Sequence, residues 1–185
     1  FAGRQSGALR QRVEFGKGET GIGQMAMQLN LREAKRWDDI LAQVERAANA
    51  AKPGDWILGR GWHQAKWERT PEPTVEGFPL HAGLSRVSPA NPVLLVHASG
   101  HASFANAAAL RAAGITRDTP SPKGGAIVKD AAGEPTGLLQ EAAAGAVRSA
   151  YERWRAGLPD AARQAEARRF VELAAAECLA KGVTS

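Results

Sequence analysis

Residues 91–106 read NPVLLVHASGHASFAN, and this stretch decides the expected fold. Pro92 to Val96 form a short, continuous apolar run rich in β-branched residues, which is typical of a strand buried on both faces. The residues from Ala107 to Ala113 predict a short helix, and Gly114 would provide its left-handed cap. A strand that leads through a polar turn into a helix is a common position for a functional site.

Three polar residues, His97, Ser99 and His101, stand at every second position in the segment between the predicted strand and the predicted helix. An extended chain would place all three on one face, whereas a turn at Gly100 would scatter them. In either case we expect any site of this chain to lie directly after the strand.

The residues before this stretch predict a helix, a strand and a loop. Residues 36–51 have apolar residues at helical spacing, and residues 55–62 predict a strand whose glycines permit a bulge. Residues 63–79 are too rich in proline for a helix or a central strand. Trp62 and Trp67 either pack over the edge of the core or line a pocket, and packing is favoured because tryptophan is usually buried.

The residues after it predict a β-hairpin, formed by residues 126–129 and 136–140, and then two helices. The first helix is expected over 141–155, with Glu141 at its start, where the helix dipole favours a carboxylate. The second is expected to begin at Asp160 as N-cap and to end at Gly182. Its expected buried stripe consists of Val171, Ala174, Ala175, Cys178 and Leu179.

Together these elements predict an α+β fold, with helices packed on one face of a mixed or antiparallel sheet. Residues 1–28 are expected to be an N-terminal arm, although residues 25–30 alternate like a short strand, and residues 29–185 are expected to form the folded domain. Residues 183–184 resemble the beginning of a further strand. Phe1 in place of methionine indicates that the chain was cut from something longer.

The composition excludes several classes of protein. The chain is 44% hydrophobic and 23% charged, which is typical of a globular domain, and no apolar run approaches the roughly 20 residues of a membrane-spanning helix. The net charge is +5, but the arginines are spread along helices beside glutamates, so nucleic acid is not an expected partner. The single cysteine, Cys178, can form no internal disulfide and fits a reducing, cytoplasmic compartment.

The residues carry no complete catalytic or metal-binding motif. The histidines at 63, 81, 97 and 101 lack the HxH and HExxH patterns of zinc sites, and Ser99 and Ser103 lack the G-x-S-x-G nucleophile elbow. His97 and His101 are therefore interpreted as side chains that satisfy buried backbone groups or line a polar cleft, in preference to catalysis. On its residues alone, the chain is a domain with a plausible polar cleft.

A series of short motifs nevertheless resembles the YtcJ-like branch of the metal-dependent amidohydrolases, also called amidohydrolase family 3. The motifs occur in that family's order and cover about residues 29–185. They are Gly54-Asp55-Trp56-Ile57, Gly59-Arg60-Gly61-Trp62, Ser88-Pro89, Asn91-Pro92-Val93, Ser99-Gly100-His101-Ala102, Asn106, Ala109-Leu110, Ala113-Gly114-Ile115, Pro122-Lys123-Gly124-Gly125, Gly133-Glu134-Pro135-Thr136-Gly137-Leu138-Leu139, Glu141 and Gly182-Val183-Thr184-Ser185.

The resemblance implies a TIM barrel that carries zinc or another divalent metal, with a large α+β insertion between its first helix and its second strand. This chain resembles that insertion, flanked by barrel-type helices over residues 36–51 and 161–181. The family's HxH motif should precede Leu29, but residues 15–24 contain no histidine. The resemblance thus implies metal ligands and catalytic residues elsewhere in a parent protein, and none in this chain.

The expected function is therefore that of an excised insertion domain, inactive alone, from a hydrolase of amide-type, non-peptide carbon–nitrogen bonds. It would cover the barrel's active site and contact a small-molecule substrate. The residues expected at that pocket are Trp62, His63, His97, His101 and Glu141.

Two other functions stay open at this point. One is a self-contained binding module for a small molecule or a protein. Such a module could form a homodimer and would expose an apolar patch at the tryptophan loop. The other is a small enzyme that uses His97, His101 and Glu141, which requires these groups within hydrogen-bond reach of one another.

Overall fold

A computed structural model of the chain describes residues 28–180, which contain a six-stranded sheet in the order β1-β2-β5-β6-β8-β7. β1 pairs with β2 and β2 with β5 in parallel, whereas the pairs β5–β6, β6–β8 and β8–β7 are antiparallel. The expected α+β fold with a mixed sheet is thereby confirmed. The strands are β1 (Leu29–Asn30), β2 (Ile57–Trp62), β5 (Val93–His97), β6 (Ala102–Ala105), β7 (Gly125–Lys129) and β8 (Pro135–Glu141).

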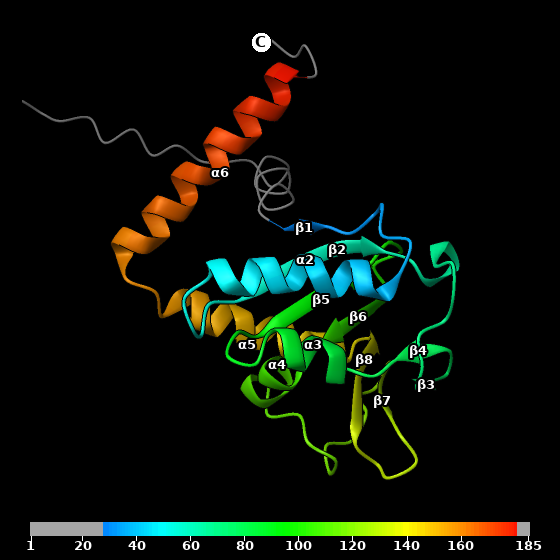
Figure 1. Cartoon of the computed structure of the whole chain (residues 1–185). Helices are drawn as coiled ribbons and strands as arrows, with labels where there is room; N and C mark the ends of the chain where they lie inside the picture. The colour runs from blue at the N-terminus through cyan, green and yellow to red at the C-terminus, as the bar shows by residue number, and fades with distance from the viewer. Residues whose placement is uncertain (1–27, 181–185) are drawn as a thin grey trace, which may run out of the picture.

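Helices cover both faces of this sheet, whereas the sequence places them on one (Figure 1). Alternate residues of β5 show the reason, because Val93 and Leu95 pack with α2 while Leu94 packs with α4 and α5. A central strand with apolar residues on both sides needs cover on both sides. The helices are α2 (Trp37–Ala50), α3 (Ala82–Val87), α4 (Ala107–Ala112), α5 (Ala144–Ala156) and α6 (Asp160–Ala180).

The central stretch forms a hairpin rather than a strand followed directly by a helix. β5 ends at His97, residues 98–101 turn, and β6 returns antiparallel before α4 begins. Gly100 has φ +83°, so the chain turns here and the three polar residues do not lie along one extended strand, although hydrogen bonds link them through Ser99. The helix and its cap are as predicted, since α4 ends at Ala112 and Gly114 has φ +69°.

A bulge at Gly61 places Trp62 in the core. Gly61 has φ +95°, and the pairing of β2 with β5 shifts between Arg60 and Trp62. Without the extra residue, strict alternation would put Trp62 on the same face as Leu58, against α5. With it, Trp62 joins Ile57 on the α2 face, is 0% exposed and donates its indole N–H to Leu95 O at 3.0 Å.

The proline-rich loop contains short regular elements that the sequence does not predict. They are the 3₁₀ turn η1 (Gln64–Lys66), the two-stranded ribbon β3 (Thr74–Val75) with β4 (Phe78–Pro79), and α3 directly afterwards. The packing interpretation of its tryptophan is confirmed, because Trp67 packs against Trp37 and Trp62, with ring centroids 5.6 and 6.1 Å apart. The loop thus covers the edge of the core and exposes no apolar patch at Trp67.

The C-terminal helix α6 extends away from the sheet (Figure 1), and its expected buried stripe is wrong where the side chains are described. Val171 is 52% exposed and Ala175 is exposed. Figure 1 shows this part of α6 extending away from the sheet and the other helices, so Val171 and Ala175 are not packed on them. Most of the N-terminal arm, residues 25–27 of the expected strand, Gly182 and residues 183–184 lie outside the described residues, as do the side chains of Ala174, Cys178 and Leu179.

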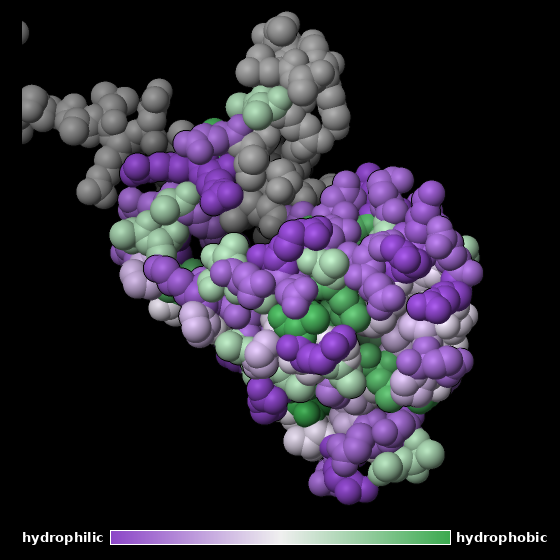
Figure 2. Space-filling model, viewed as in Figure 1, coloured by the Kyte–Doolittle hydropathy of each residue, from purple (hydrophilic) through white to green (hydrophobic). Residues whose placement is uncertain are grey.

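The surface over α2 is mostly hydrophilic, with a narrow strip of hydrophobic residues between α2 and α3 (Figure 2). This agrees with α2 being amphipathic, as predicted: Trp37, Ile40, Leu41 and Val44 are buried and its charged residues face outward. No helix within residues 28–180 is long and apolar enough to cross a membrane.

Asn106 connects the amino end of β5 to its surroundings by four hydrogen bonds. Its Oδ1 accepts from Val93 N at 2.9 Å and from Ala109 N at 3.0 Å, which caps α4. Its Nδ2 donates to Ser88 O at 2.8 Å and to Asn91 O at 2.9 Å. The side chain is 0% exposed, so all of its hydrogen-bonding capacity is satisfied by protein groups.

We expect Asn106→Ala to lower the free energy of unfolding by about 3 kcal/mol or more, because it removes a hydrogen bond from each of four backbone groups. Asn91 O keeps a second partner, the Ser88 hydroxyl. Urea denaturation followed by circular dichroism measures this loss of stability. Ser103→Ala is the matched control: Ser103 is also 0% exposed, but its Oγ has no hydrogen-bond partner within residues 28–180. That control should be neutral or slightly stabilising. Equal losses in the two variants would contradict the assigned role of Asn106.

Candidate functional site

Polar side chains gather where β2, β5 and β8 end. β2 and β5 are parallel, and β8 runs in the same direction as β5 because each is antiparallel to β6. Their last residues are Trp62, His97 and Glu141, and His101 lies in the turn beside them. This edge of the sheet therefore brings together side chains that are up to about eighty positions apart in the sequence.

His97 is almost buried, at 8% exposure, and both of its ring nitrogens have partners. Nδ1 accepts the backbone N–H of Ser99 at 3.1 Å and lies 2.8 Å from Ser99 Oγ. Nε2 lies 3.0 Å from Gln64 Oε1. Because an accepting Nδ1 carries no proton, these contacts fit a neutral imidazole that donates from Nε2 to Gln64.

The surroundings of His97 also favour its neutral form. Burial lowers its pKa, and the nearby His63 and His101 lower it further. The ring of His63 lies 4.7 Å from that of His97, and the ring of Trp62 lies 4.5 Å away in an edge-to-face contact. A charge on His97 would therefore be poorly solvated and close to two other imidazoles.

His101 and Glu141 form an exposed pair. His101 Nδ1 lies 3.1 Å from Glu141 Oε1 and 3.2 Å from Oε2, and the two side chains are 71% and 57% exposed. The backbone joins them as well, since Glu141 N donates to His101 O at 2.7 Å. His101 N in turn donates to Ser99 Oγ at 3.2 Å, which links the pair to His97.

The sequence predicts that Glu141 opens a helix, but in the structure Glu141 is the last residue of β8. It pairs with Gly125 on β7, and α5 begins only at Ala144. Its φ of +50° lies in the left-handed region, which non-glycine residues rarely adopt. The hairpin register extends one residue further than the run of alanines after Glu141 suggests.

The other two predicted site residues lie beneath or beside this edge. Trp62 is wholly buried, so it supports the ring of His97 from below. His63 is partly exposed, and its Nδ1 accepts from Ala65 N at 3.2 Å, which begins η1. The structure thus brings all five predicted residues to one edge, but only His63, His101 and Glu141 are accessible from outside.

Sequence reasoning missed two residues of this network. Gln64 contacts His97 from a separate loop, and nothing in its surroundings in the sequence indicates that contact. Ser99 was expected among the polar side chains after the strand and was rejected as a nucleophile, but its role in the turn was not foreseen: it accepts from His101 N and contacts His97. Its position two residues after a histidine is the one local signal for such a turn.

The side chains within residues 28–180 do not fit a metal ion. No three histidine, cysteine, aspartate or glutamate side chains converge among those that the structure describes in this range. Both nitrogens of His97 are engaged, and His101 with Glu141 provides only two ligands. The stand-alone enzyme hypothesis meets a related obstacle, because His97 reaches the other two residues only through Ser99.

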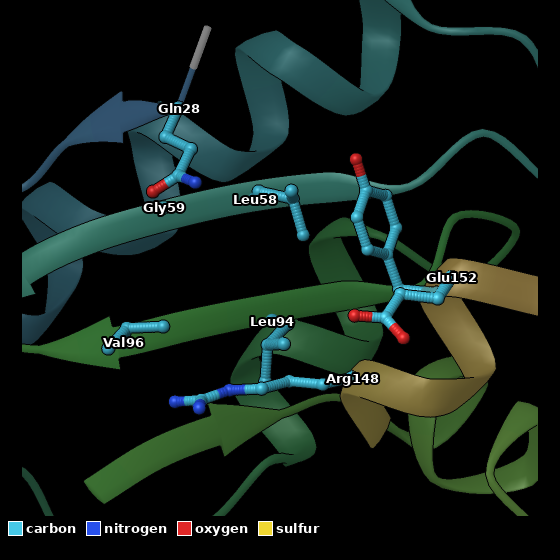
Figure 3. A pocket seen from close by; sticks show the side chains of 8 residues that line it. Gln28, Leu58, Gly59, Leu94, Val96, Arg148 and Glu152 are labelled. Atoms are coloured by element: carbon cyan, nitrogen blue, oxygen red, sulfur yellow. The ribbon is translucent and has the colours of Figure 1, made fainter. Parts of the chain in front are cut away.

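A separate hollow of about 250 Å³ lies on the α5 face of the sheet (Figure 3). Leu58 of β2 and Leu94 of β5 form part of its floor, and Arg148 and Glu152 of α5 lie beside them. Burial raises the pKa of Tyr151, which also lines it, so that phenol stays protonated. None of the five predicted site residues lines this hollow, and no motif in the sequence predicts it.

Comparison with known proteins agrees with the resemblance in the sequence. A family described as the amidohydrolase family matches residues 20–185. The chain is 43% identical over 119 residues to a protein named as amidohydrolase YtcJ from Bacillus subtilis (strain 168), covering 64% of this chain and 21% of that protein. It is 42% identical over 113 residues to N-substituted formamide deformylase from Arthrobacter pascens, covering 61% and 20%. The chain thus spans about a fifth of the length of these relatives.

The fold also has a counterpart among solved structures. A crystal structure of an uncharacterized metal-dependent hydrolase from Pyrococcus horikoshii OT3 matches 90% of this chain and 28% of that chain, with a TM-score of 0.58 and 21% sequence identity. At this identity the match shows the fold alone.

We expect the chain to lose stability as the pH falls from about 7 towards 5. Burial lowers the pKa values of His97 and His81, whereas in the unfolded chain both return to about 6.5. Below that pH the unfolded chain binds protons that the folded chain does not, so the free energy of unfolding decreases; above pH 7 these two groups contribute no pH dependence. Urea denaturation between pH 5 and 8 measures the effect.

His97→Gln and His81→Gln should each flatten this dependence, and the double variant should flatten it most. Glutamine keeps hydrogen-bonding capacity but cannot titrate. An unchanged slope in the double variant would show that neither histidine is held neutral by the fold.

Proposed function

Because the chain belongs to the amidohydrolase family, we propose that it is a segment of a metal-dependent hydrolase that acts on amide-type carbon–nitrogen bonds other than peptide bonds. The names of its relatives support this reaction class, since one is a deformylase of N-substituted formamides. The segment's own part in the reaction is to cover the active site and to shape substrate recognition. The observation that carries this role is the ordered polar edge at the ends of β2, β5 and β8.

The edge has the properties of a surface that meets a substrate. His101 and Glu141 are exposed, yet their backbones are tied to each other and to Ser99, so their positions are defined before any ligand arrives. The carboxyl ends of parallel strands, as in β2 and β5, are where ligands usually bind in such sheets. We therefore assign His63, His101 and Glu141 as the residues that approach the substrate, with His97 and Trp62 supporting them.

A divalent metal in the parent protein would be bound by residues outside 28–180, because the side chains in this range provide no suitable set of ligands. Such a metal would activate a water molecule for hydrolysis. The residues of this segment would bind and orient the substrate and exclude bulk water. On this proposal the 185-residue chain is inactive alone.

The hollow beside α5 favours a second candidate, a binding module for a small amphipathic molecule. Its floor is apolar, and Arg148 and Glu152 offer charged groups at its side. Saturable binding of a ligand by the 185-residue chain, lost in Leu58→Trp and kept in His101→Ala, would favour this candidate over the first.

We expect the full-length parent to contain a divalent metal and to hydrolyse members of a panel of formamides, acetamides and carbamates, whereas the 185-residue chain does neither. In the parent, His101→Ala should lower kcat/KM by about tenfold or more, because it removes a hydrogen bond to the bound substrate. Arg111→Ala is the control, since Arg111 is exposed on α4 away from this edge. Stoichiometric metal in the 185-residue chain, or unchanged kinetics in His101→Ala, would refute the proposal.

A further inference from the structure

We propose that His101 selects substrates with an N–H group at the scissile bond, by accepting a hydrogen bond from that N–H at its Nε2 atom. Substrates of this class are secondary amides and carbamates, as opposed to their N-alkylated tertiary analogues. This inference rests on the proposed function and deepens it. It follows from the geometry of the His101–Glu141 pair.

The pair fixes which nitrogen of His101 is available to a ligand. Nδ1 lies within hydrogen-bond distance of both carboxylate oxygens of Glu141, at 3.1 and 3.2 Å. An ionised carboxylate can only accept, so Nδ1 must carry the proton. In the neutral imidazole, Nε2 then has a lone pair and no hydrogen, which makes it an acceptor.

The acceptor is available and its position is defined. His101 is 71% exposed, and no partner of Nε2 is found within residues 28–180. The backbone of His101 is nevertheless held at both polar groups, because its N–H donates to Ser99 Oγ and its C=O accepts from Glu141 N. Ser99 is held in turn by His97, which is nearly buried.

The backbone of Glu141 indicates that its carboxylate has a purpose beyond the fold. Its φ of +50° is a conformation that glycine or asparagine adopts at lower cost. A glutamate in that position costs stability, and its exposed side chain contributes no buried contact in return. Orienting the His101 ring is the interaction that its side chain makes within residues 28–180. Strain of this kind is typical of residues that serve a site.

A hydrogen-bond acceptor at this position favours substrates that have an N–H group over analogues that lack one. A secondary amide satisfies the lone pair of Nε2, whereas a tertiary amide places an alkyl group against it and leaves it unpaired. Sites that hydrogen-bond a substrate N–H reject analogues that lack it more strongly than apolar pockets reject an extra methyl group. In this selection Glu141 acts as a positioning residue, because it fixes the tautomer of His101 and does not itself bond to the substrate N–H.

The first experiment measures the tautomers directly in the 185-residue chain, by ¹⁵N nuclear magnetic resonance of the imidazole rings at pH 8.5. We expect the Nδ1–H form for His101 and the Nε2–H form for His97. Glu141→Gln should shift the tautomer equilibrium of His101 and leave that of His97 unchanged. A predominant Nε2–H form at His101 in the unsubstituted chain would overturn the inference, because Nε2 would then be a donor.

The second experiment compares substrates in the full-length parent, using N-alkyl and N-aryl formamides, acetamides and carbamates, each beside its N-methylated analogue. Intrinsic reactivity cancels when the effect of a substitution is compared between the two members of a pair. His101→Ala should lower kcat/KM for the secondary compound by about tenfold and change that for the tertiary compound little. Glu141→Gln should also lower the ratio of kcat/KM for the secondary compound to kcat/KM for its tertiary analogue, by a smaller factor than His101→Ala.

The outcomes separate this inference from the proposed function. If the parent hydrolyses amides but His101→Ala affects both members of each pair equally, the selection of an N–H group is wrong while the proposed function stands. If the parent hydrolyses none of the compounds, both are wrong. Arg111→Ala is the control and should leave the ratio unchanged.

Discussion

The structure depends on the four hydrogen bonds of the buried Asn106 side chain. They join the start of β5, the start of α4, the end of α3 and the loop before β5. That loop reaches further through Asn91, whose side chain donates to Lys52 O and Asp55 O, beyond α2 and before β2. Two asparagines thus connect five elements at one end of the sheet. Loops buried at that depth need such partners, because their backbone polar groups cannot reach water.

This arrangement gives the two ends of β5 different roles. At the amino end, each polar atom of the Asn106 side chain is paired inside the protein. At the carboxyl end, His97 is nearly buried, but the turn that follows carries His101 out to the surface beside Glu141. The sheet between them is held by apolar residues on both faces of β5. His101 can therefore be held at the surface by the turn after β5, while Asn106 holds the amino end of the same strand.

The sequence predicted elements with strong periodicity and missed those fixed by distant contacts. The run from Val93, the stripe of α2 and the glycine bulge of β2 were all readable, as was the hairpin of β7 and β8. β6 was missed because its four residues, Ala102 to Ala105, contain no β-branched residue and lead directly into a helix. Glu141 was misplaced because the alanines after it favour a helix, whereas pairing with Gly125 keeps it in β8. Gln64 was missed because its contact with His97 spans 33 positions.

The neutral state of His97 couples the stability of the fold to the geometry of the site. Its Nδ1 can accept the Ser99 N–H only while unprotonated, and Ser99 Oγ in turn accepts from His101 N. Protonation would remove the acceptor of the Ser99 N–H and would place a poorly solvated charge beside His63 and His101; burial and then these two groups lower the pKa of His97. The turn would then lose the bond from Ser99 N–H to His97 Nδ1, which is one of the two contacts between Ser99 and His97. The buried imidazole of His97 is thus linked through Ser99 to the backbone of the exposed His101.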